Sequence, residues 1–422
     1  MRLINILVLV FAAFFSCAAE PVKLDPMPKP IAARPIKPEI AVNNAGSAAM
    51  IWETFSKEIY VVAGFDQEWP EPYLIARGES PKITIDRSGN AVAVWISHRT
   101  IQAAVFDANL RSWSTPTTVV KREAQLTDLK LAGNANGTVA ALWIEQISGQ
   151  PLRVFSVLLS KSGGEWSKPE ALSDGENPAT LPAIAMNAEG LILAAWEENM
   201  GAISVVKYTQ CTKDQTWAPP LQISSTDRHA ICPSVAIDDH GNGILLWVRH
   251  HSEMPAVVEA AMLPADGSWI HPMDLGLTDL TSYPKLVMNG NGYAAAIWSG
   301  DDHPFICFSS VQFGSAWSTV IEIPKSLSWF TGLAISPSGR VVVVWKNFFR
   351  KEGRDYNSIE SAIIPSHGEW IRLFQIIKPQ VIDSVPFPIN KLDHPQVGLD
   401  GTTHGYIVWG TARFPFIQIS DF

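Results

Sequence analysis

The side chains with the most chemical potential follow directly after eight regularly spaced tryptophans. They change in charge and type from one repeat to the next, whereas the tryptophans before them do not change. Carboxylate, guanidinium, imidazole and ammonium groups can together bind a polar ligand if the fold brings them to one place. The candidate ligand-binding residues are His98, Arg99, Glu145, Glu197, Glu198, Arg249, His250, Asp301, Asp302, His303 and Lys346, with Trp329 as an aromatic residue outside the repeat. The alternative is that they are solvated loop tips, which are polar in most proteins.

Two neighbouring groups contain residue types that bind metal ions. One is the run from Arg249 to Glu253, which includes His250 and His251, and the other is the run from Asp301 to His303. Carboxylates and imidazoles suit a divalent ion where they converge. The spacing matches no metal-binding motif, so we predict no metal site, no cofactor and no catalytic residue.

The tryptophans that precede these residues mark an internal repeat. They are Trp52, Trp95, Trp143, Trp196, Trp247, Trp298, Trp345 and Trp409, at intervals of 43 to 64 residues. In seven copies a glycine lies six residues earlier, and in six copies a proline lies fourteen residues earlier. This period is typical of a four-stranded propeller blade, and the sequence therefore predicts an all-β fold, an eight-bladed β-propeller forming one domain over residues 20–422.

Each repeat predicts four strands, A to D. Strands A and B flank the glycine turn and are apolar on both faces, and strands C and D flank a turn that carries a second tryptophan. The A–B half of the repeat occurs eight times, but the C–D half with its second tryptophan occurs only seven times. Pro21–Leu24 matches the Pro-x-x-aliphatic pattern of strand D, so we expect this N-terminal strand to complete the last blade beside the run from Phe414, with seven blades as the alternative. Residues 371–394 predict a long strand D and a connecting loop.

Strict recurrence indicates that the repeated tryptophans pack between sheets, although aromatic faces also bind sugars. In a propeller the B–C and D–A loops open on one face, around the mouth of the central channel. The candidate residues would gather there. Cys211, Cys232 and Cys307 are expected as buried thiols, because Cys211 and Cys232 fall at opposite faces of the ring.

The composition and the first residues of the chain indicate the cellular compartment and argue against some classes of partner. The net charge is −9 with no basic block, which argues against nucleic acid and anionic membranes. Residues 1–19 have an early arginine, an apolar run and small residues, the pattern of a signal peptide. We therefore expect export to the periplasm, the outer-membrane surface or the medium. Cys17 leaves open a lipid anchor instead of simple cleavage.

The tryptophan turns carry a family resemblance. The runs Ser160–Pro169, SKSGGEWSKP, and Pro264–Pro272, PADGSWIHP, resemble the Asp-box turns of sialidase-like propellers, although the aspartate and the glycine spacing vary between copies. A sialidase would imply an arginine cluster, a tyrosine–glutamate nucleophile pair and an acidic proton donor. The eight-bladed plan with an export signal also resembles the periplasmic scaffold lipoproteins of outer-membrane assembly.

These observations lead to two functional hypotheses. The first is a non-catalytic propeller that binds a protein or glycan of the cell envelope through its channel-mouth face. The second is a sialidase-like glycoside hydrolase, which the resemblance implies without a shared catalytic motif.

Overall fold

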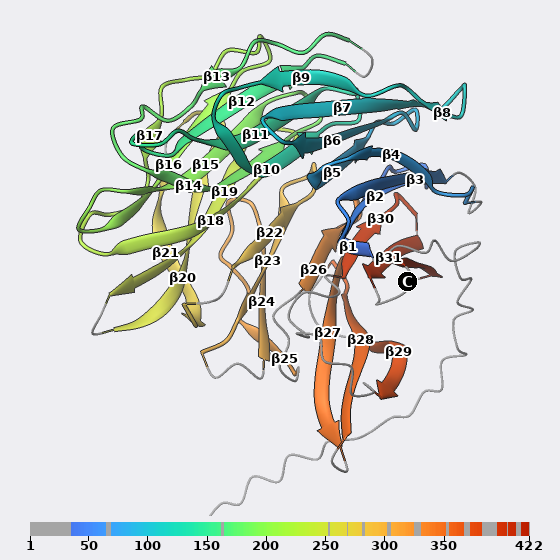
Figure 1. Cartoon of the computed structure of the whole chain (residues 1–422). Helices are drawn as coiled ribbons and strands as arrows, with labels where there is room; N and C mark the ends of the chain where they lie inside the picture. Colours follow the sequence, from blue (N-terminus) through green and yellow to red (C-terminus); the bar gives the residue numbers. More distant parts are fainter. Residues whose placement is uncertain are drawn as a thin grey trace, which may run out of the picture.

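The computed structural model describes residues 35–64, 69–161, 164–251, 254–267, 269–280, 283–301, 305–324, 331–351, 354–366, 372–381, 395–402, 404–410 and 415–421. In these residues the chain is all β and forms eight antiparallel sheets, each built from consecutive strands (Figure 1). The prediction of eight blades is confirmed.

Each sheet begins with a strand A and continues outward through strands B, C and D. The A strands are β1 (Pro35–Val42), β5 (Glu79–Ile85), β10 (Gln125–Gly133), β14 (Ala179–Met186), β18 (His229–Ile237), β22 (Lys285–Met288), β26 (Thr331–Ile335) and β30 (Gln396–Leu399). The B strands are β2 (Ala48–Thr54), β6 (Ala91–Ser97), β11 (Val139–Gln146), β15 (Ile192–Asn199), β19 (Gly243–His251), β23 (Tyr293–Ser299), β27 (Val341–Lys351) and β31 (His404–Gly410).

The outer strands complete the blades. The C strands are β3 (Glu58–Gly64), β7 (Thr100–Asp107), β12 (Arg153–Leu159), β16 (Ser204–Cys211), β20 (Met254–Leu263), β24 (Phe305–Gln312), β28 (Arg354–Ile364) and β32 (Pro415–Asp421). The D strands are β4 (Tyr73–Arg77), β8 (Ser112–Trp113) with β9 (Thr117–Lys121), β13 (Glu170–Ala171), β17 (Leu221–Gln222), β21 (Ile270–Thr278), β25 (Ile321–Pro324) and β29 (Arg372–Val381). β32 takes the strand C place predicted for the run from Phe414, and β29 is the predicted long strand D.

The eight sheets form a closed ring. Each strand A contacts the strand A of both neighbouring blades, and β30 of the last blade contacts β1 of the first. Figure 1 shows the blue first sheet beside the red last sheet. At this seam the Gly401 amide donates to the Asn44 carbonyl (3.1 Å) and the Tyr406 hydroxyl donates to the Gly46 carbonyl (2.7 Å). The predicted closing strand, Pro21–Leu24, lies outside the described residues.

The tryptophans of the B strands hold neighbouring sheets together. All eight side chains are 0% to 3% exposed. Trp143, for example, packs in one cluster with Val94 and Ile96 of the preceding blade. Fully burying such a side chain removes a large apolar surface from water. The prediction that these tryptophans are structural is confirmed.

The turn between strands A and B depends on a residue that lies nine positions before each tryptophan. In seven blades this residue is Asn or Asp, and in the seventh blade it is Ser336. The Asn43 side-chain oxygen accepts hydrogen bonds from the amides of Ala45 and Ser47, both at 3.0 Å. The glycines of these turns have φ between 82° and 91°, a backbone conformation that is unfavourable for residues with a side chain.

Four of these asparagines also connect one blade to the next. Asn187 donates from Nδ2 to the carbonyl of Asp238 (2.8 Å), which is the equivalent residue of the following blade. Asn43, Asn134 and Asn289 repeat this bond.

In blades 1, 2, 4 and 5 the proline fourteen residues before the tryptophan lies in a β-bulge, where the pairing of strands A and B shifts register. Blade 3 has the same shift with Leu129 in the place of the proline. Ser80, Leu181 and Cys232, which directly precede the proline, have φ from 49° to 55°. A bulge accommodates proline because the ladder is already interrupted.

Two further expectations can be compared with the structure. Cys211, Cys232 and Cys307 are buried, as predicted. Strand B is buried, as predicted, but the prediction that strand A is apolar on both faces is wrong: β5, for example, carries Glu79 and Lys82 and is mostly half-buried. Within the described ranges, no helix is long and apolar enough to span a membrane.

Candidate functional site

The B–C and D–A loops lie side by side on one face of the ring, here called the mouth face. In blade 1 the amide of Gly78, in the D–A loop, donates to the carbonyl of Lys57, in the B–C loop (2.8 Å). In blade 2 the amide of Arg122 donates to the carbonyl of Arg99 (3.0 Å). The predicted placement of the two loop sets on one face is therefore confirmed.

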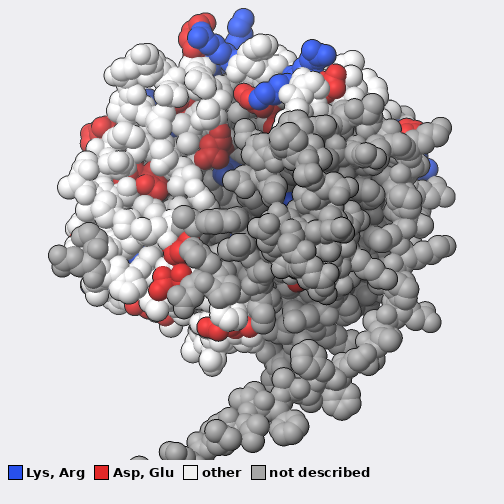
Figure 2. All heavy atoms as spheres, turned by 60° about the horizontal axis from the view of Figure 1, so that its bottom comes forward, with Lys and Arg blue, Asp and Glu red and all other residues white. Residues whose placement is uncertain are grey.

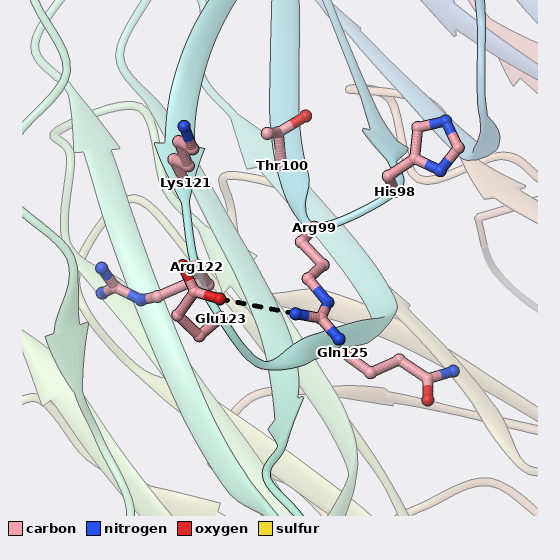
Figure 3. A pocket seen from close by; sticks show the side chains of 7 residues that line it. All are labelled: His98, Arg99, Thr100, Lys121, Arg122, Glu123 and Gln125. Carbon is pink, nitrogen blue, oxygen red and sulfur yellow. Dashed lines mark hydrogen bonds and ion pairs between the residues drawn. The ribbon is translucent and has the colours of Figure 1, made fainter.

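A recess opens on this face between blades 2 and 3. Its volume is about 530 Å³. Figure 3 shows residues of the β6–β7 turn on one side and residues that follow β9 on the other. The lining residues are His98, Arg99, Thr100, Lys121, Arg122, Glu123 and Gln125. We call this the mouth pocket.

Three cationic side chains and one carboxylate give the mouth pocket a positive character. Arg99 Nη1 lies 3.4 Å from Glu123 Oε2, and both side chains are largely exposed. This pair is weak because water screens it. The Arg99 guanidinium thus remains available to a ligand.

The turn that carries His98 and Arg99 is tight. Ser97 pairs with Thr100, which leaves only these two residues in the loop. His98 has a φ of 55°, a conformation that costs energy for a residue other than glycine. The Thr100 hydroxyl donates to the Ser97 carbonyl (2.7 Å) and closes the turn. The imidazole is consequently presented at the pocket edge by a constrained backbone.

Glu145 belongs to the interior. Its carboxylate is 6% exposed and accepts hydrogen bonds from Trp143 Nε1 (3.1 Å) and from Arg122 Nε (2.6 Å). The Arg122 guanidinium also lies 5.6 Å from the centre of the Phe155 ring, which stacks on Trp143. Glu145 therefore satisfies a buried indole and holds Arg122 at the wall of the mouth pocket.

Glu198 repeats this arrangement in blade 4. It is 0% exposed, accepts from Trp196 Nε1 (3.2 Å) and lies 2.6 Å from Lys207 Nζ. Lys207 also pairs with Asp174 at 3.2 Å. Burial acts to lower the pKa of Lys207, but the bonds to Glu198 and Asp174 outweigh it and raise the pKa.

Arg249 takes part in a similar group in blade 5. Its Nε lies 3.1 Å from Glu259 Oε1, and Glu259 Oε2 accepts from Trp247 Nε1 at 2.7 Å. Arg249 Nη2 also pairs with the exposed Asp274 (2.8 Å). Burial raises the pKa of Glu259, although Arg249 and the indole act to lower it.

Glu197 and His250 lie between blades 4 and 5. Glu197 accepts hydrogen bonds from the Ser204 hydroxyl and the Cys232 amide, and burial raises the pKa of its carboxyl. His250 stacks on His229, with ring centres 4.6 Å apart. Burial lowers the pKa of His250, and His229 and His251 lower it further.

The remaining candidates are dispersed. Lys346 is buried on β27, and Asp301 is exposed in the turn after β23. Asp302, His303 and Trp329 lie outside the described residues. The ring of candidates therefore does not form one site: His98 and Arg99 share the mouth pocket, while Glu145, Glu198 and Arg249 form separate ion pairs. In the described part of the chain, no cluster of three metal-binding side chains occurs.

Sequence reasoning missed half of the mouth pocket. Lys121 ends strand D of blade 2, Arg122 and Glu123 follow it, and a D–A loop opens on the same face as the B–C loops. Comparing both loop sets would have identified them. Figure 2 shows acidic side chains spread over the surface in that view, with many of the basic ones near its upper edge.

No protein-family model matches the chain, and no curated protein does either. Solved structures define the fold class as a β-propeller. The chain is similar to the BP39L lectin of Burkholderia pseudomallei, at 15% identity and a TM-score of 0.57, over 82% of this chain and 99% of that one. It is also similar to the WD40 domain of SCAP from fission yeast, at 10% identity and a TM-score of 0.56, over 94% of this chain and 98% of that one. Such low identities support the shared fold alone.

Proposed function

We propose that the protein is a non-catalytic binding propeller that takes an acidic carbohydrate through its mouth face. The observation that carries this proposal is the mouth pocket between blades 2 and 3, whose lining contains Arg99, Lys121 and Arg122. Arg99 pairs weakly with Glu123 and Arg122 with the buried Glu145, so Lys121 adds an excess positive charge. A protein of net charge −9 concentrates positive charge there.

The chemistry of the lining suits a sugar that carries a carboxylate or sulfate. Arg99 can form paired, charge-assisted hydrogen bonds to such a group. The Thr100 hydroxyl and the Gln125 amide supply donors and acceptors for sugar hydroxyls. The likeness to a lectin propeller agrees with this ligand class, although a protein ligand with acidic side chains would use the same groups.

The internal pairing of the acidic candidates favours binding over glycoside hydrolysis. A glycosidase needs two carboxyl groups that face the scissile bond. Glu145 and Glu198 instead accept hydrogen bonds from buried indoles and pair with cations.

A glycan array with the purified full-length chain tests this proposal. We expect binding to glycans that contain uronic acid, sialic acid or sulfate. Arg99→Ala should weaken it by about tenfold or more, because a charge-assisted hydrogen bond is lost. Arg87→Ala is the matched control, since Arg87 is exposed on the A–B turn of the same blade, at the opposite face. Equal binding by wild type and Arg99→Ala would refute the pocket assignment.

A sialidase-like hydrolase is the second candidate because the carboxylate of Glu197 lies near enough to Tyr283 to act on its pKa. The pKa of Tyr283 is raised, first by Cys232, then by burial and by Glu197. Tyr283 is 65% exposed. Cleavage of a fluorogenic sialoside by wild type, with its loss in Tyr283→Phe, would favour this candidate over simple binding.

We further propose that the chain is exported. The pattern of residues 1–19 supports this location, and Cys17 supports a lipid anchor as the alternative to cleavage. Cell fractionation, together with the mass of the mature N-terminus, distinguishes the two forms. Full-length protein in the cytoplasm would contradict both.

A further inference from the structure

The A strands surround the central channel, and one position on each lies at the same level in every blade. This position is thirteen residues before the tryptophan, and in every blade it pairs with the residue just before that tryptophan. Figure 1 shows the A strands in the middle of the molecule. The eight residues are Glu39, Lys82, Lys130, Ala183, Ser234, Lys285, Gly332 and Gln396.

Three of the eight are lysines, and their partners do not neutralise them completely. Lys82 pairs with Glu39 of the neighbouring blade. Lys130 Nζ lies 3.0 Å from Asp128 Oδ1. Lys285 donates to the carbonyl of Thr331, and among the described residues no carboxylate forms an ion pair with it. Three ammonium groups therefore face two carboxylates, which leaves an excess of one positive charge.

The lysines share one lumen, although they come from different sides of the ring. Burial lowers the pKa of Lys285 to about 8; Glu39 acts to raise it, and Lys82 and Lys130 lower it further. The register places Lys82, Lys130 and Lys285 at one level of the inner ring that the contacting A strands form, so their side chains border the same axial space. Ala183 and Ser234 are small and leave room at the same level.

We propose that the central channel binds an oxyanion group (a carboxylate, sulfate or phosphate) between Lys82, Lys130 and Lys285. An ammonium group has three donors, and Lys285 uses one of them on the Thr331 carbonyl. An anion would accept charge-assisted hydrogen bonds from the others and remove the repulsion between the lysines. This site is separate from the mouth pocket, and it does not depend on the proposed function.

Isothermal titration calorimetry of the full-length chain tests the site. Sodium sulfate, sodium phosphate and sodium glucuronate are titrated separately at constant ionic strength, so that the three arms distinguish an inorganic ion from a sugar carboxylate. We expect saturable binding of at least one of them at a site that Arg99→Ala leaves intact. Lys285→Met should weaken it by about tenfold or more, because one charge-assisted bond is lost. Lys285→Arg should retain binding.

Lys213→Met is the matched control, since it removes one lysine charge from an exposed pair with Glu189. It should leave the affinity unchanged. The proposal is overturned if none of the three anions binds, if Lys285→Met binds as tightly as wild type, or if both methionine variants lose affinity equally.

Proton uptake by the wild type gives a test that needs no variant. Sulfate does not titrate in this range, and its binding raises the pKa of Lys285 from about 8, so sulfate binding at pH 8 should take up about half a proton and at pH 6.5 almost none. Glu39, Lys82 and Lys130 are the charged groups that act on Lys285, and Asp128 pairs with Lys130. Binding without proton uptake at pH 8 would exclude Lys285 from the site.

Discussion

Replacing Lys207 by methionine should destabilise the protein strongly, because it leaves a buried carboxylate without its cation. Glu198 is 0% exposed, and its Oε1 lies 2.6 Å from Lys207 Nζ. Its other oxygen accepts from Trp196 Nε1 at 3.2 Å. The variant keeps an unbranched apolar stem of similar size and removes the ammonium group with its charge and its donors.

The size of the effect follows from the burial of the pair. Breaking a buried ion pair by removing one partner costs about 3–5 kcal/mol, since the remaining charge is desolvated and uncompensated. We expect Lys207→Met near the lower end of this range, because Lys207 is 16% exposed and water can reach its site. Replacing both partners, as in Glu198→Met with Lys207→Met, should recover much of the loss. The indole left without a partner is tolerable, since Trp52, Trp95 and Trp345 have no partner at Nε1 in the described part of the chain.

Urea denaturation followed by tryptophan fluorescence measures these differences. Lys213→Met serves again as the control, because its exposed pair with Glu189 should contribute nothing measurable. If Lys207→Met unfolds at the same urea concentration as wild type, the reasoning is refuted. A double variant less stable than Lys207→Met alone would also contradict it.

Three further predictions concern pH, the turns and the thiols. Burial raises the pKa of Asp174, but the Glu176 amide and Lys207 outweigh it and lower the pKa, so the contribution of Asp174 to stability should be lost as the pH falls below about 4. The pKa of Lys207 is raised, so the contribution of Lys207 should be lost only as the pH rises above about 10.5. A series of thermal melts at different pH values checks both expectations. Asn187→Asp should lower the free energy of unfolding by about 1 kcal/mol or more in urea, because the donor to the Asp238 carbonyl is lost while the turn acceptor remains. Cys211 and Cys232 should resist a thiol reagent at pH 8 until the protein is unfolded, because burial raises the pKa of each thiol to about 12; rapid labelling of the folded protein would contradict this.

The blade plan could be predicted from the sequence because packing repeats wherever the geometry repeats. The indoles of Trp52 and Trp345 occupy equivalent places between sheets, so selection for the same fit leaves the same residue at the same offset. The hydrogen-bond acceptors of the A–B turns were harder to recognise in the sequence. Asn43, Asp86 and Ser336 are different residue types, although the side-chain oxygen of each accepts hydrogen bonds from backbone amides of its turn.

The candidate site was harder to predict, because the position after a tryptophan does not fix where a side chain points. Glu145 and Glu198 lie two residues after their tryptophans and turn inward to the indole, whereas His98 and Arg99 lie in the turn beyond the strand and face solvent. The strand continues further in some blades than in others. The B strand ends at Ser97 in blade 2 but continues to Gln146 in blade 3 and Asn199 in blade 4, and the sequence did not reveal these different ends.

The seam between the first and last blades has a consequence for how the chain is made. Tyr406 and Gly46 are 360 residues apart, and their contact joins blade 8 to blade 1. During synthesis the face of β2 that packs against Tyr406 and Val408 of blade 8 therefore stays uncovered until almost the whole polypeptide has emerged. A stop codon placed just before Tyr406 would leave seven complete sheets, with an apolar face exposed at each end of the open ring. We expect such a truncated product to aggregate, because the strands that close the ring are the last to be translated.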